Sequence, residues 1–304
     1  MKIGLIDVDG HNFPNLALMK LSSYHKKIGD DVEWYNPITA LCNGEYDRVY
    51  MSKVFTFTED YQNHIYAKEI IRGGTGYFYP DGGEKLPYEI EHIYPDYDLY
   101  GIKDTAYGFL SRGCPRGCDF CIVKHKEGQK SVKVADLSEW WHGQKNIELM
   151  DPNILACSDY EDLLHQLIDS KSWVNINQGT DIRIMTDRKA ELLKQIKMKT
   201  VHFAWDRYED KDMIIPKLKS FKEITGWNRR KLIVYVLVNF NTTEEQDLER
   251  IYTLRELGYW PYVMIFEKDK LPRGHRIKKM QRWVNNRFIW EKCETFDEYI
   301  SNKL

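Results

Sequence analysis

Apolar residues along this chain follow two alternating patterns, short unbroken runs and longer stretches at helical spacing. In the first hundred residues, the runs predict strands at 2–9, 32–35 and 47–52. The helical spacing predicts helices at 17–28 and 61–72, which end at glycines. Because buried parallel strands read as continuous apolar runs joined by helices, this order indicates a small doubly wound α/β domain.

The same alternation continues from Thr105 to the last quarter of the chain. The strand Leu232–Val238 is apolar and β-branched, which is typical of a strand buried on both faces. Thr242 and Glu245 have the spacing of a capping box, and Gly258 ends the helix that follows. The predicted strands are 106–110, 146–150, 173–176, 200–204, 232–238 and 262–266, and the predicted helices are 134–141, 159–171, 188–198, 211–225 and 242–257. Residues 75–104 are predicted to be an irregular connection.

Three cysteines, Cys114, Cys118 and Cys121, lie close together directly after the predicted strand 106–110. Thiolates are soft ligands that suit iron–sulfur clusters, zinc and Cu(I). Three thiolates around a four-iron cube leave one iron open to a small molecule. Zinc is the alternative, but neither Cys157 nor Cys293 has a partner at the spacing that zinc pairs usually show.

The spacing C-x3-C-x-Phe-C resembles the cluster loop of radical S-adenosylmethionine enzymes. The resemblance implies that the three cysteines bind a [4Fe–4S] cluster, whose open iron chelates the amino and carboxylate groups of S-adenosylmethionine. One electron, from an external one-electron donor, then cleaves this cofactor to methionine and a 5′-deoxyadenosyl radical that abstracts hydrogen from the substrate. The resemblance also implies a partial (β/α)6 TIM-type barrel over residues 101–270.

In such barrels the chemistry lies at the C-terminal ends of the strands, and several polar residues follow those ends. Arg183 is expected to hold the cofactor carboxylate, and the alternative is an internal ion pair with Asp181. The turn Asp151-Pro-Asn153 is expected to contact the cofactor amino group, or else to be a capped turn. His202 lies within a strand and is expected to be a core histidine. The expected cofactor-binding residues are Phe120, Asp151, Asn153, Gln178, Asp181, Arg183, Asp206 and Asn239; the sequence identifies no catalytic residue.

Residues 1–100 resemble the cobalamin-binding, Rossmann-like domain of one radical subclass. Asp9-Gly-His11 is similar to the start of a D-x-H-x-x-G motif, with Pro14 in place of its glycine, and the pairs Tyr46-Asp47 and Gly73-Gly74 fall where the resemblance places them. Two interpretations stay open, namely a cobalamin site and a plain α/β cap in which His11 is a turn residue. The glycine pair has its own alternative, which is to end the helix before it.

Residues 271–304 are predicted to form a basic helical tail. The stretch 268–292 contains nine Lys and Arg residues, interleaved with Trp283, Phe288 and Trp290. Basic residues with aromatics suit single-stranded nucleic acid. The same pattern suits an amphipathic helix that buries its aromatics and keeps its charges in water, and this second interpretation is favoured.

Composition narrows the function classes. The net charge is −2, so no global basic field points to nucleic acid, and no apolar run reaches the ~20 residues of a membrane helix. Six cysteines in 304 residues are not a disulfide framework, and the N-terminus has no signal-peptide pattern, so a cytoplasmic location is expected.

The sequence therefore predicts a radical S-adenosylmethionine enzyme whose substrate is a small molecule, a peptide or RNA. Cobalamin-dependent methyl transfer and RNA modification are the alternatives within this class. Methylthiolation usually needs a second cluster, and Cys42, Cys157 and Cys293 are too far apart in the sequence to form another motif. The alternative from another class is a nucleic-acid-binding protein stabilised by zinc or a cluster.

Overall fold

A computed structural model describes residues 1–301, which group into two compact units. The first unit contains residues 1–130 and 134–147, and the second contains residues 131–133 and the chain from Glu148 onward. Both are mixed α/β with parallel strand pairs, as the alternating pattern predicted. The predicted domain limits at residues 100 and 270 stay predictions.

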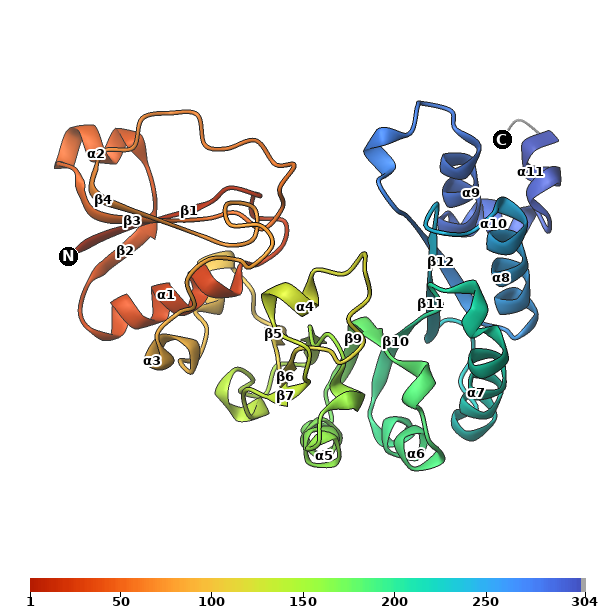
Figure 1. The fold of residues 1–304 in the computed structure, drawn as a ribbon. Helices are drawn as coiled ribbons and strands as arrows, with labels where there is room; N and C mark the ends of the chain where they lie inside the picture. Colours follow the sequence, from red (N-terminus) through yellow and green to blue (C-terminus); the bar gives the residue numbers. More distant parts are fainter. Residues whose placement is uncertain (302–304) are drawn as a thin grey trace. The chain divides into compact units, whose positions relative to one another are not determined.

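The first unit contains a parallel sheet of β1 (Lys2–Asp7), β2 (Asp31–Trp34), β3 (Tyr46–Ser52) and β4 (Ala67–Gly73), in the order β2-β1-β3-β4. Helix α1 (Leu16–Lys27) starts at Asn15, whose side chain accepts the Leu18 N–H. Alternation along β1 places Ile3 and Leu5 in one core with Leu18 of α1. Ile6 belongs to a second core with Ala40 of α2 (Pro37–Asn43). Helices therefore cover both faces of this sheet (Figure 1).

The predicted helix at 61–72 is wrong, because residues 67–73 form the edge strand β4, parallel to β3. Charged side chains are common on edge strands, and those of β4 form ion pairs with residues of β3. Lys68 Nζ lies 2.6 Å from Asp47 Oδ1, and Glu69 Oε2 lies 2.6 Å from Arg48 Nε. Gly73-Gly74 consequently ends a strand rather than a helix. Gly74 has φ +95°, and a β-carbon there would lie 2.4 Å from the Lys53 carbonyl oxygen.

The rest of the first unit is built from short elements. They are α3 (Tyr88–Glu91), the 3-10 helix η1 (Tyr97–Tyr100), β5 (Thr105–Gly108), β6 (Ser111–Arg112), α4 (Val123–Lys126) and η2 (Leu137–Glu139). The predicted helix at 134–141 is wrong, since only the single turn η2 forms there. Glu139 accepts the Asp136 N–H at 2.8 Å, which closes this turn, and Trp140 is buried directly after it.

The second sheet has the order β12-β11-β10-β9-β8-β5, and β8 spans the boundary between the two units. The sheet contains β8 (Asn146–Leu149), β9 (Trp173–Thr180), β10 (Met198–Ala204), β11 (Leu232–Val238) and β12 (Trp260–Ile265), which confirm the predicted runs to within two residues except at the end of β9. Strand β9 continues four residues past its predicted end, so Gln178 lies within the strand rather than after it. The strands β9 to β12 pair in parallel. The helices α5 (Tyr160–Ser170), α6 (Asp187–Gln195), α7 (Lys211–Thr225) and α8 (Glu244–Glu256) follow these strands (Figure 1). The N-cap of α8 is Thr243, one residue later than predicted.

Short 3-10 turns stand near the strand ends of the second unit. They are η3 (Ile154–Ala156), η4 (Ile182–Ile184), η5 (Tyr208–Asp210) and η6 (Lys268–Lys270), and the two-residue strand β7 (Val132–Lys133) precedes them in the chain. Each of these turns follows the strand before it within a few residues, so the loops after the strands are tightly wound.

The basic tail forms α9 (Arg276–Asn285), α10 (Arg287–Lys292) and α11 (Phe296–Ser301). Trp283 and Trp290 are buried, Phe288 is exposed, and the Arg255 guanidinium of α8 stacks 3.8 Å from the Trp290 ring. The favoured interpretation, in which the aromatics pack inward, is confirmed for the two tryptophans. Within residues 1–301, no helix is long and apolar enough to cross a membrane.

Substituting Gly108 tests the packing of β5. A β-carbon at Gly108 would lie 2.3 Å from Trp140 Cδ2, so Gly108→Ala should lower the free energy of unfolding by about 1–3 kcal/mol. Gly73 ends β4 with nothing within 4 Å of its β-carbon position and serves as the matched control. Urea denaturation of both variants checks this, and equal midpoints for the two would contradict the packing.

Candidate functional site

The loop that carries the three cysteines is closed at its base by the backbone. The Cys114 N–H donates to the Gly128 carbonyl at 3.1 Å, and the Cys121 N–H donates to the Cys118 carbonyl at 3.0 Å. Gly113 has φ +87°, and a β-carbon there would lie 2.2 Å from the Lys130 carbonyl oxygen. Only glycine fits where the two ends of the loop meet.

The three thiols are not in disulfides and are partly exposed. A set of three thiols on one closed loop fits an iron–sulfur cluster or another soft metal by its chemistry. In residues 1–301, however, no three Cys, His, Asp or Glu side chains are gathered closely enough to hold a metal ion. The chain thus supplies a suitable donor set, whose side chains are not arranged as ligands.

A buried carboxylate stabilises the base of this loop. The Glu127 side chain is 8% exposed and accepts the Gly113 N–H at 3.3 Å and the Arg112 guanidinium at 3.4 Å. The guanidinium also stacks 3.8 Å from the Phe109 ring. Since burial of an unpaired carboxylate is costly, this ion pair and hydrogen bond hold the start and the end of the loop together.

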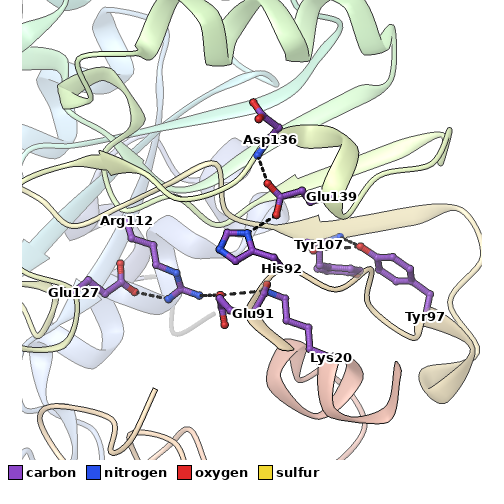
Figure 2. A network of polar contacts seen from close by, with 9 residues as sticks. All are labelled: Lys20, Glu91, His92, Tyr97, Tyr107, Arg112, Glu127, Asp136 and Glu139. Atoms are coloured by element: carbon purple, nitrogen blue, oxygen red, sulfur yellow. Dashed lines mark hydrogen bonds and ion pairs between the residues drawn. The ribbon is translucent and has the colours of Figure 1, made fainter. Parts of the chain in front are cut away.

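The same network continues to helix α1. Glu91 Oε1 lies 3.7 Å from Arg112 and accepts the Lys20 ammonium at 3.0 Å, and Lys20 also donates to the Glu91 carbonyl (Figure 2). Burial lowers the pKa of Lys20. These contacts connect the first helix of the chain to the base of the cysteine loop within one unit.

In the second unit, Arg183 is held by two carboxylates. Its Nε lies 2.8 Å from Asp181 Oδ1, and its Nη1 lies 3.0 Å from Asp210 Oδ2. The internal Asp181–Arg183 ion pair considered from the sequence is therefore present, and Asp210 is a second partner. Bidentate binding of a cofactor carboxylate by Arg183 stays a prediction, which would require these contacts to be exchanged.

The polar residues of β9 lie beside a core histidine. Asn177 Nδ2 donates to Glu148 at 3.3 Å, and the Asn177 carbonyl accepts the Tyr235 hydroxyl at 2.6 Å, while Gln178 is exposed. His202 stacks on the Tyr235 ring at 5.1 Å, and its Nδ1 lies 2.7 Å from the Ile176 carbonyl. His202 therefore has the buried, hydrogen-bonded position expected of a core residue, and burial lowers its pKa.

Arg250 fixes the loop after β10. It is fully buried and donates to the carbonyls of Trp205 at 2.6 Å, Asp206 at 3.1 Å and Leu237 at 2.8 Å, and its Nη2 lies 2.5 Å from Asp247. One buried cation thus joins the ends of two neighbouring strands. Leaving Asp247 without this partner would cost about 3–5 kcal/mol.

Asp206 carries the most perturbed carboxyl group of this region. Although the residue is partly exposed, its Oδ1 is buried and accepts no hydrogen bond from residues 1–301. Burial raises the pKa of Asp206 from 3.8 to about 6, with the charge of Arg250 opposing the shift. A carboxyl group of this kind exchanges its proton near neutral pH.

A pocket of about 330 Å³ lies at the ends of β10 and β11. It is lined by Asp206, Arg207, Glu209, Asp210, Phe240, Asn241 and Thr242. Asn239, just before this segment, has φ +64° and donates to the Phe266 carbonyl at 2.9 Å, so its side chain closes a turn. Asp151 and Asn153 are buried, the Asn153 carbonyl accepts the Ser131 hydroxyl at 3.0 Å, and Asn153 precedes η3 without a side-chain cap, so the role of this turn stays a prediction.

The structure thus brings Asp181, Arg183 and Asp210 together and places Asp206 in a pocket with Asp210. Phe120 and the cysteines belong to the first unit. Sequence reasoning missed Asp210, Arg250 and Glu127. Arg250 had a visible signal, because it shares a helical face with Ile251 and Leu254, where a charged residue needs a buried partner.

No protein-family model matches the chain, and no curated protein resembles it detectably in sequence. The functional interpretation therefore depends on the chain's own residues and their geometry.

The pKa of Asp206 predicts a stability that depends on pH. A carboxyl whose pKa is higher in the folded state binds more protons there, so the free energy of unfolding should fall as pH rises from about 4 to about 6 and stay lower above that window. Asp206→Asn removes this penalty. The variant should be more stable than the parent at pH 8, by at most about 3 kcal/mol, and equal to it near pH 4.

Urea denaturation between pH 4 and pH 8 measures both proteins. Asp212→Asn is the matched control, because Asp212 is exposed on the first turn of α7 and its replacement should leave the profile unchanged. An Asp206→Asn variant that is less stable than the parent at pH 8 would show that the ionised carboxylate is stabilised by its surroundings.

Proposed function

We propose that the protein is a radical S-adenosylmethionine enzyme. The observation that carries the proposal is the loop with Cys114, Cys118 and Cys121, closed at its base and placed after the short strands β5 and β6. Three thiols on one loop suit a four-iron cluster with one iron left for the cofactor. A [4Fe–4S] cluster, when bound, would supply the electron that cleaves S-adenosylmethionine.

The chain's own residues would bind the cofactor and orient it. Cys114, Cys118 and Cys121 would hold the cluster, and Phe120 would lie beside the adenine ring. Asp206 and Asp210 line a pocket whose carboxylates suit the hydroxyl groups of a ribose. Arg183 would exchange an internal carboxylate for that of the cofactor. The substrate would be a small molecule, a peptide or RNA. An external one-electron donor would supply the electron, and the reaction would take place in the cytoplasm.

The sheet order supports a partial (β/α)6 barrel for the cofactor domain. From β5 to β12, the strands of this sheet follow one another in space in the same order as in the sequence, and the pairs from β9 to β12 are parallel. Successive right-handed strand–helix units build a barrel in this way. The first sheet, with helices on both faces, supports a Rossmann-like domain before it.

Cobalamin is a narrower proposal for this first domain. The His11 ring stacks 4.1 Å from the Trp34 ring and lies 5.7 Å from the Tyr100 ring. These contacts favour a packing role for His11, and therefore a cap over the substrate, above a role as a cobalt ligand. Methyl transfer from cobalamin follows only if the chain retains cobalamin.

The non-enzymatic alternative, a metal-stabilised nucleic-acid-binding protein, gains less support. It requires aromatic side chains that bases can stack on. Trp283 and Trp290 are buried in the tail, which leaves Phe288 as its exposed large aromatic ring within residues 268–292.

Reductive cleavage of the cofactor tests the proposal. Anaerobically reconstituted protein with dithionite and S-adenosylmethionine should form 5′-deoxyadenosine, and Cys114→Ala, Cys118→Ala and Cys121→Ala should each reduce its formation at least 100-fold. Cys42→Ala is the matched control, because Cys42 is exposed on α2 and is not part of the loop. The proposal would be wrong if the parent forms no 5′-deoxyadenosine. It would also be wrong if the loop variants form 5′-deoxyadenosine at the parent rate.

A further inference from the structure

Lys53 stands out in the first unit as a lysine whose side-chain stem is buried. It follows β3 and is 8% exposed, yet within residues 1–301 its ammonium makes no hydrogen bond or ion pair. Its Nζ lies 5.7 Å from the centre of the Tyr77 ring. Its Nζ is not among the fully buried polar atoms, so the stem of Lys53 is buried while its ammonium reaches solvent and can accept an anionic ligand.

The side chain of Lys53 packs against a glycine-rich segment, residues 73–83. A β-carbon at Gly76 would lie 2.4 Å from Lys53 Cγ, so glycine is required for the lysine to lie there. Gly74, Gly82 and Gly83 have φ between +80° and +95°. In residues 1–301, the backbone N–H groups of Gly74 and Thr75 donate to no acceptor. Successive N–H groups in such turns form concave sites for anions.

A second lysine approaches the same segment from the cysteine loop. Lys126 is the last residue of α4, and its Cε lies 3.6 Å from the β-carbon position of Gly82. The hydroxyl oxygen of Thr75 lies 3.7 Å from that same position. In the described chain neither the Lys126 ammonium nor the Thr75 hydroxyl has a hydrogen-bond partner, and burial lowers the pKa of Lys126.

Two of the acidic groups nearby are already engaged, while Asp81 within the segment and Glu84 just after it are exposed to solvent. Glu127, the neighbour of Lys126, pairs with Arg112. Asp60 accepts a hydrogen bond from the Tyr77 hydroxyl, and this bond is the main cause of the lowered pKa of Asp60. The positive charges of Lys53 and Arg72 lower this pKa further. Lys53 and Arg72 thus act together on the single carboxylate of Asp60, and Lys126 adds a further positive charge beside the segment.

We propose that residues 73–83, with Lys53 and Lys126, bind a phosphate group of a ligand. Two ammonium groups, a hydroxyl and unused backbone N–H donors match the several oxygens of a phosphate better than the two of a carboxylate. Because Lys126 is five residues beyond Cys121, a ligand held here by its phosphate lies beside the cysteine loop. This inference goes beyond the proposed function and does not depend on it.

Calorimetric titration of the iron-free, full-length chain with inorganic phosphate, in a chloride buffer, tests the site. The parent should bind phosphate saturably, and Lys126→Met should weaken binding at least tenfold. Lys126→Arg keeps the charge and should bind within threefold of the parent. Lys85→Met is the matched control, because Lys85 is an exposed lysine just beyond the same segment, and it should bind like the parent.

Acetate, titrated in the same way, should bind at least tenfold more weakly than phosphate. Lys53→Met should also lose phosphate binding. The circular dichroism spectrum of this variant shows whether the protein still folds, so that a loss of binding can be distinguished from a loss of structure. The inference is overturned if the parent does not bind phosphate, if Lys126→Met binds like the parent, or if acetate binds as tightly. Because no cluster or cofactor is present in these titrations, such a result leaves the proposed enzyme activity untouched.

Discussion

Parallel strand pairing is the constraint on which the candidate sites depend. When neighbouring strands run the same way, all their C-terminal ends meet at one edge of the sheet, and so do the loops that follow them. In the second unit this brings Arg183 after β9, Asp210 after β10 and Asn241 after β11 to the same edge, although these residues are far apart in the sequence. In the first unit, the same rule gathers Lys53 after β3 and the glycine-rich segment after β4.

Buried charges then fix the loops at these edges. Arg250 reaches three carbonyl oxygens and Asp247, so the turns after β10 and β11 are held by one side chain. Glu127 has the same role at the base of the cysteine loop, where its carboxylate accepts hydrogen bonds from the Arg112 guanidinium and the Gly113 N–H. A rigid scaffold with polar groups fixed in this way is what a site for a reactive cofactor requires, since small displacements of the reacting groups are costly in rate.

Local signals in the sequence were sufficient for most of the longer strands. Leu232–Val238 was predicted to the residue, because a β-branched apolar run has few other stable conformations. The edge strand β4 was mistaken for a helix, because Ile65, Tyr66 and Ile70 have helical spacing while its charged residues hide the strand pattern.

Long-range pairings were beyond such reasoning. Nothing near Arg183 in the sequence indicates that Asp210 binds it, and Glu127 becomes meaningful only when the loop closes on Gly113. The sequence could predict that polar residues after the strands would line a site, because polar groups gather at the ends of strands. Their partners depend on how the loops fold back, which the sequence pattern does not specify.

We propose that the three cysteines on one closed loop hold a cluster with one open iron. A Mössbauer spectrum of the chain reconstituted with 57Fe tests it most directly. We expect a [4Fe–4S] signal in which a single iron site changes when S-adenosylmethionine is added. A spectrum without such a cluster, or one that is unchanged by the cofactor, would contradict the account.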